Sequence, residues 1–147
     1  MLEDDYTRSL NRLVEICECD VDIPSEWRDR LKRRGVIQPV PDDRRQYVRH
    51  RFNSQAVLEY DETFSSLPRD RTIARVVTCD VSRSGLAFLH SEQLFPGEQV
   101  TLWLPIGKRS YVVAWCVEHN DKCFVVGVAV ADNEREASAT ERNTAVN

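Results

Sequence analysis

The feature that most constrains the fold is a change in the spacing of apolar residues near Phe52. From there to about residue 131, short runs rich in β-branched and aromatic residues recur, several of them alternating with polar residues, as is typical of β-strands. Six such runs are separated by short connections: AVLEY, TIARVVTCDV, GLAFLH, VTLWLP, YVVAWCVEH and CFVVGVAV. So few strands avoid open edges by closing on themselves. The sequence therefore predicts a mainly β fold, a six-stranded antiparallel β-barrel over 52–131.

The connections between these strands carry turn residues. FPGEQ, IGKRS and NDK are predicted turns, the last one closing a tight hairpin. Asp80, Ser82 and Gly85 lie where one strand is expected to end and the next to begin, and Asp and Ser favour turns because their side chains bond nearby backbone. Gly85 is expected to supply a positive φ. Taken alone, this stretch is simply a turn.

Two helices are predicted ahead of the barrel, in an N-terminal extension over 1–38. The shorter one lies within IPSEWRDRLKRRG, where Trp27 and Leu31 share a face and Gly35 is the expected stop. The first helix carries an apolar stripe at helical spacing, formed by Leu2, Tyr6, Leu10, Leu13 and Cys17. We expect this stripe to pack on the barrel, the alternatives being a second copy of the chain or another protein.

Residues 39–51 are predicted to form a hinge followed by an arginine-rich arm. Pro39 and Pro41 favour an extended chain at the hinge. At the other end of the barrel, the segment 132–147 is polar, and we expect a tail that is partly disordered.

Positive charge gathers on one segment of a chain whose formal net charge is −4. The basic residues between 28 and 51 are Arg28, Arg30, Lys32, Arg33, Arg34, Arg44, Arg45, Arg49 and Arg51. They form either a solvated helix end and linker or a binding surface for an anion. A guanidinium fits a phosphate or the O6/N7 edge of guanine, and a carboxylate accepts hydrogen bonds from the other guanine edge. The acidic balance of the whole chain argues against general DNA or RNA binding.

Several other classes of protein are disfavoured by the sequence. The five cysteines form no C-x-x-C pair, so no metal site is expected. No catalytic motif or phosphate loop is present, and we predict that the protein is not an enzyme. No apolar run reaches the roughly 18 residues of a membrane span. The acidic N-terminus is unlike a signal peptide, which leads us to expect a cytoplasmic location.

Two motifs, read together, resemble those of a known family. Arg45-Q-Y-V-Arg49 and Asp80-V-Ser82-R-S-Gly85 match the R-x-x-x-R and [D/N]-x-S-x-x-G signatures of the PilZ domain, in the family's order. The final hairpin, with Gly127 inside the last strand, is also similar to the family's closing hairpin. The resemblance covers residues 44–131.

The resemblance implies a β-barrel that binds the bacterial second messenger cyclic di-GMP without any cofactor. The arm would fold over the ligand, with Arg45 and Arg49 as the principal clamp and Arg44 as the additional arginine that often precedes the motif. Asp80, Ser82 and Gly85 would form the half of the site on the barrel. We expect a non-catalytic receptor whose arm and N-terminal helices rearrange for a downstream protein partner or a homodimer. The alternative is a PilZ-like interaction module that binds no nucleotide.

Overall fold

The computed structural model describes residues 2–17, 19–32, 35–36, 50–64, 66, 69 and 72–131. Its helices and strands are, in chain order, α1 (Leu2–Ile16), α2 (Ser25–Leu31), β1 (Gly35–Val36), β2 (His50–Arg51), β3 (Gln55–Glu62), β4 (Ile73–Val81), β5 (Gly85–His90), β6 (Gln99–Leu104), β7 (Gly107–Asn120) and β8 (Cys123–Val130). Each of the six predicted strands is present, although some of their ends differ from the expected ones.

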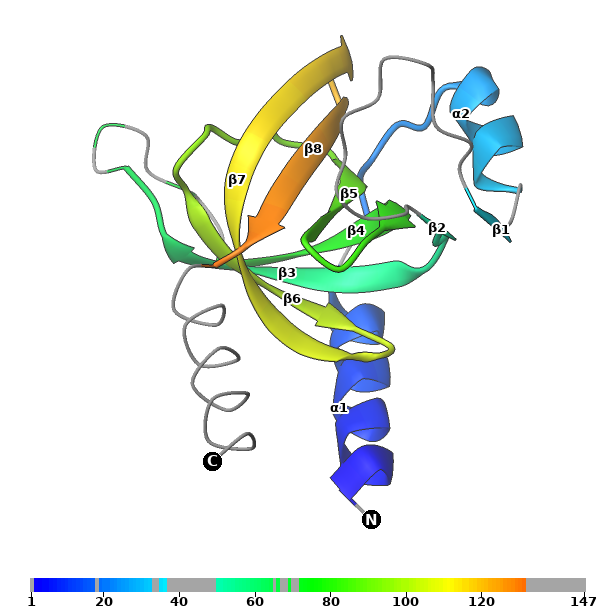
Figure 1. The fold of residues 1–147 in the computed structure, drawn as a ribbon, viewed down its shortest axis with the longest axis vertical. Helices are drawn as coiled ribbons and strands as arrows, with labels where there is room; N and C mark the ends of the chain where they lie inside the picture. The colour runs from blue at the N-terminus through cyan, green and yellow to red at the C-terminus, as the bar shows by residue number, and fades with distance from the viewer. Residues whose placement is uncertain are drawn as a thin grey trace, which may run out of the picture.

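Strands β3 to β8 close into an antiparallel barrel (Figure 1). The order around the barrel is β4-β3-β6-β7-β8-β5, and β5 pairs back with β4. Closure leaves no open edge between the first and last of these strands, which removes a site of unwanted strand pairing. The prediction of a mainly β fold with a six-stranded antiparallel barrel is confirmed.

The barrel interior is filled by apolar side chains from all six strands. Phe88, Leu102 and Val126 are completely buried there. Each such side chain contributes roughly 1.5–3 kcal/mol to stability relative to its exposed state. On β5 the outward-facing residues Ala87 and Leu89 are buried as well, which indicates that another layer covers this part of the barrel.

Helix α1 packs on the outside of the barrel near β3 and β6 (Figure 1). Leu10 and Cys17 are buried, and the Tyr6 ring stacks on Trp103 with 5.8 Å between ring centroids. The Tyr6 hydroxyl donates to the Leu104 carbonyl at 2.6 Å. Burial raises the pKa of the Tyr6 hydroxyl above its usual value. The prediction that the stripe packs on its own barrel is confirmed for Tyr6, Leu10, Leu13 and Cys17, whereas the side chain of Leu2 lies outside the described part of the structure.

Helix α2 and the segment before it cover a different part of the barrel (Figure 1). Trp27 and Leu31 both pack against the outward-facing residues of β5 and β8, which confirms that they share a face. The helix ends at Leu31, so the predicted stop at Gly35 is wrong. Gly35 begins β1 instead, because its backbone pairs with β2.

The turn between β6 and β7 is shorter than the sequence predicts. It consists of Pro105 and Ile106 alone. The predicted turn at IGKRS is therefore wrong for most of its length, since Lys108, Arg109 and Ser110 pair with β6. Gly107 makes the sharp reversal possible, because its φ of 140° is strained for residues with a side chain.

Parts of the expected organisation fall on residues that the structure does not describe. These are most of the hinge and arm, over 37–49, and the tail over 132–147. The domain boundaries drawn from the sequence accordingly stay predictions. Within the described residues, no helix has the length and apolar character needed to span a membrane.

Candidate functional site

Three of the six predicted site residues lie at one junction of the barrel. Asp80 is the last residue but one of β4, Gly85 is the first of β5, and the residues 82–84 connect the two strands. We call 82–84 the β4–β5 loop. The predicted position of Asp80, Ser82 and Gly85, where one strand ends and another begins, is confirmed. Their part in binding a ligand stays a prediction.

The β4–β5 loop is closed by backbone bonding and leaves a weakly engaged hydroxyl. The Ser82 amide donates to the Gly85 carbonyl at 2.8 Å. The Ser82 hydroxyl lies 3.3 Å from the Ser84 hydroxyl and donates to the Gly85 carbonyl at 3.4 Å, both long for hydrogen bonds between oxygens. Because Asp80, Ser82 and Gly85 are only half-buried, a ligand at the surface can reach them.

Gly85 is required here for a reason other than the expected one. Among the described residues, only Gly97 and Gly107 have a positive φ, so the prediction of a positive φ at Gly85 is wrong. A Cβ on Gly85 would lie 2.0 Å from the carbonyl oxygen of Val128 on the neighbouring strand. Glycine thus allows β5 and β8 to approach closely at the start of β5.

The last two residues of the arm lie beside this junction. Strand β2 pairs with the end of β4, so that Arg51 is opposite Asp80 and His50 is opposite Val81. On its other side β2 pairs with β1, where Val36 is opposite His50. Val36 and His50, the described residues on either side of the segment 37–49, are consequently held next to each other, close to the Asp80 end of β4. Arg44, Arg45 and Arg49 themselves lie outside the described residues.

A tryptophan that sequence reasoning missed lies in the same cross-strand row as Asp80. Paired residues connect Asp80 to Ala87, then to Gly127 and then to Trp115. Because neighbouring strands are about 4.8 Å apart, the row spans about 14 Å. The Trp115 ring covers Gly127, where a Cβ would lie 2.1 Å from the ring, and 43% of Trp115 is exposed. Only the strand register reveals this, because Trp115 is 35 residues from Asp80 in sequence.

A second group of polar side chains surrounds the other end of β5. His90 and Glu98 are completely buried, and Glu98 pairs with Arg69 and accepts a hydrogen bond from the Phe95 amide at 2.8 Å. The Tyr60 hydroxyl lies 2.8 Å from His90 and donates to Glu92 at 2.5 Å. Arg69 also lies 3.8 Å from Glu92 and so links the two groups, which is the arrangement expected of a structural network. No group of His, Cys, Asp or Glu in the described parts of the chain is placed to hold a metal ion.

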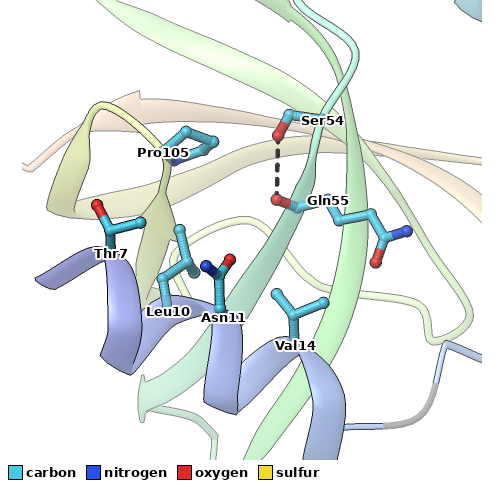
Figure 2. Close-up of a pocket in the computed structure, with 7 residues that line it drawn as sticks. All are labelled: Thr7, Leu10, Asn11, Val14, Ser54, Gln55 and Pro105. Atoms are coloured by element: carbon cyan, nitrogen blue, oxygen red, sulfur yellow. Dashed lines mark hydrogen bonds between the residues drawn. The ribbon is translucent and has the colours of Figure 1, made fainter. Parts of the chain in front are cut away.

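A groove of about 390 Å³ lies between α1 and the start of β3 (Figure 2). Thr7, Leu10, Asn11 and Val14 of α1 face Ser54, Gln55 and Pro105 across it. Of the predicted ligand-binding residues, the three that the structure describes, Asp80, Ser82 and Gly85, do not line this groove. It is therefore separate from the junction of β4 and β5.

Comparison with protein families agrees with the fold. The family model described as the PilZ domain matches residues 43–143, which is more than two thirds of the chain. A search of the curated proteins finds no match. PilZ domains are in general non-catalytic receptors for cyclic di-GMP. With its closed barrel and this match over most of its length, the chain belongs to the PilZ domain family.

Proposed function

We propose that the protein binds cyclic di-GMP between the arginine arm and the junction of β4 and β5. The observation that carries the proposal is the pairing of His50 with Val81 and of Arg51 with Asp80. Arg49 is joined to His50 by a single peptide bond, so its Cα is about 3.8 Å from that of His50. An arginine side chain that starts there is long enough to meet a ligand lying on Asp80 and Ser82.

The two halves have complementary chemistry for a guanine dinucleotide. On the arm, Arg45 and Arg49 would hold guanine and phosphate through bidentate bonds, with Arg44 adding positive charge. On the barrel, the Asp80 carboxylate would accept hydrogen bonds from the N1–H and amine of guanine, and Ser82 would exchange its long bonds for ligand contacts. Gly85 would keep the loop close to β8 and leave the guanine site unobstructed.

Trp115 would supply an aromatic wall to the same site. The row from Asp80 to Trp115 is about 14 Å long, which suits a ligand with two bases. The exposed part of the ring offers a face on which one base can stack.

Closure of the arm would be transmitted to the N-terminal helices. The Asn53 side chain, just after the arm, donates to the carbonyl of Leu31 at the end of α2 at 2.6 Å. Strand β1, which follows α2, pairs with β2 at the base of the arm. We propose that ligand binding rearranges the arm and shifts α2 through these contacts. A downstream protein partner or a homodimer would recognise the shift in a bacterial cytoplasm. No catalytic step and no cofactor belong to this function.

Calorimetric titration of the intact chain tests the proposal. We expect the wild type to bind cyclic di-GMP and to bind neither cyclic di-AMP nor GTP with comparable affinity. Arg45→Ala and Arg49→Ala should each weaken binding by roughly 100-fold or more, because each removes a bidentate charged contact. Arg12→Ala, which removes an exposed arginine of α1, is the matched control and should bind as the wild type does.

Two results would contradict the proposal in different ways. Wild-type affinity in both arm variants would remove the arginines from the site. The absence of binding by the folded wild type would favour the alternative, a PilZ-like interaction module that does not bind nucleotide.

A further inference from the structure

The chain between β2 and β3 carries one residue more than the strand it faces. Arg51 is opposite Asp80 and Gln55 is opposite Val77, so four steps on one strand match three on the other. Such a bulge interrupts the regular bonding between the strands and leaves backbone groups that need other partners. The residues concerned are 52–54, which directly follow the arm and its β2 strand.

Thr78 provides those partners from β4. Its hydroxyl donates to the Phe52 carbonyl at 2.6 Å, lies 3.2 Å from the Ser54 carbonyl and accepts a hydrogen bond from the Ser54 amide at 2.9 Å. Thr78 is completely buried, and its own amide donates to the Ser54 carbonyl at 2.9 Å. A buried hydroxyl with this set of partners holds the bulge in one conformation.

The position of Thr78 relates it to both halves of the candidate site. It precedes Asp80 by two residues, and the register of β4 against β5 shifts between these two residues. The Phe52 amide donates to the carbonyl of Cys79, the residue between them, at 3.0 Å. The base of the arm and the Asp80 end of β4 are thus joined over a few residues, with the Thr78 hydroxyl at the centre.

We propose that Thr78 is a positioning residue for the nucleotide site. Its hydroxyl fixes the base of the arm to β4, so that the arginines start from one defined place relative to Asp80. In this proposal Thr78 contacts the bulge residues and does not contact the ligand. The consequence for affinity rests on the proposed binding of cyclic di-GMP, whereas the anchoring of residues 52–54 does not.

The test compares Thr78→Val with Thr78→Ser. Valine keeps the shape and removes the hydroxyl, and serine keeps the hydroxyl. If anchoring is lost in most molecules, the apparent dissociation constant rises by the inverse of the anchored fraction, and we expect roughly tenfold weaker binding for Thr78→Val. Thr78→Ser should bind within about threefold of the wild type.

Thr101→Val is the control for a loss of stability without a loss of anchoring. Thr101 is a buried threonine of β6. Its hydroxyl donates to Asp61 at 2.5 Å, away from the arm. This variant should lower the melting temperature and leave the affinity for cyclic di-GMP unchanged. Equal affinity losses in Thr78→Val and Thr101→Val would overturn the positioning role, since general destabilisation would then explain both.

Amide hydrogen exchange measures the anchoring without any ligand. In Thr78→Val the Ser54 amide should exchange at least roughly tenfold faster than in the wild type, because its acceptor is gone. The Val113 amide, which donates to the Glu98 carbonyl away from the arm, should stay protected. Unchanged exchange at Ser54 would overturn the proposal, whether or not the wild type binds cyclic di-GMP. If the wild type does not bind cyclic di-GMP but the Ser54 amide exchanges faster in Thr78→Val, the proposed function is rejected. The anchoring of residues 52–54 by Thr78 is then still supported.

Discussion

Strand β5 joins two polar regions that differ in how their groups are satisfied. At the Gly85 end, Ser82 is half-buried and its hydroxyl makes only long hydrogen bonds within its own loop. At the His90 end, about 17 Å away along the strand, Glu98 is completely buried and pairs with Arg69. The difference separates two kinds of polar residue on a small barrel. Polar residues that are accessible and make only weak hydrogen bonds are candidates for ligand binding. Polar residues that are buried and bond to one another are structural.

The largest effect on stability is expected from a substitution that breaks the network at the His90 end. Glu98→Ala leaves Arg69 and the Phe95 amide without their carboxylate partner in a buried site. We expect a loss of about 3 kcal/mol in the free energy of unfolding, the low end for breaking a buried ion pair, because Arg69 keeps only its longer contact with Glu92 at 3.8 Å. Urea unfolding measures the loss, and Glu62→Ala, at an exposed carboxylate of β3, is the control.

Ligand binding by the folded fraction of Glu98→Ala should equal that of the wild type. A small stability change, or a specific loss of cyclic di-GMP affinity, would show that the His90 end is not merely structural.

A smaller effect, on ligand affinity rather than on stability, is expected from Asp80→Asn at the Gly85 end. The amide keeps the shape of the carboxylate but presents a donor or a neutral acceptor to the guanine edge. Affinity for cyclic di-GMP should fall by roughly tenfold or more, in line with the 1.5–3 kcal/mol of a hydrogen bond to a charged group. Calorimetry measures it, with Asp121→Asn in the exposed β7–β8 turn as the control.

The melting temperature of Asp80→Asn should remain close to that of the wild type. A dissociation constant equal to the wild-type value would show that Asp80 is not part of the site. The Gly85 end would then no longer differ from the His90 end through ligand binding by Asp80.

The smallest effect concerns the aromatic wall. Trp115→Leu should weaken binding by about 1 kcal/mol, the low end for base stacking, since more than half of the residue is already covered. Trp115→Phe keeps an aromatic face and should lose less. Titrations of both variants measure this, and stronger binding by Trp115→Leu would mean that the indole obstructs the ligand.

Much of the fold could be predicted because it depends on local patterns. The alternating strands, the stripe around Leu10 and the shared face of Trp27 and Leu31 follow from residue spacing alone. The role of Gly85 could not be predicted, because the requirement comes from Val128 on another strand rather than from its own φ. The strands β1 and β2 were missed for a similar reason, since two-residue strands have no periodicity to detect.

The candidate site was predicted from its motifs only in part. Asp80 and Ser82 are recognisable in the sequence as turn residues beside a signature glycine. Thr78 and Trp115 carry no local signal, because their partners are Phe52, Ser54 and Gly127. Tertiary register, which a single sequence does not encode in any short pattern, brings them to the same region.

The most direct measurement is an amide chemical-shift map of the intact protein with and without cyclic di-GMP. We predict that the largest changes fall on His50, Arg51, Asp80, Ser82 and Gly85, with the Trp115 indole among them, and that Tyr60, His90 and Glu98 stay unchanged. Changes centred on the His90 end, or on the groove beside α1, would contradict the assignment of the nucleotide to the arm and the β4–β5 loop.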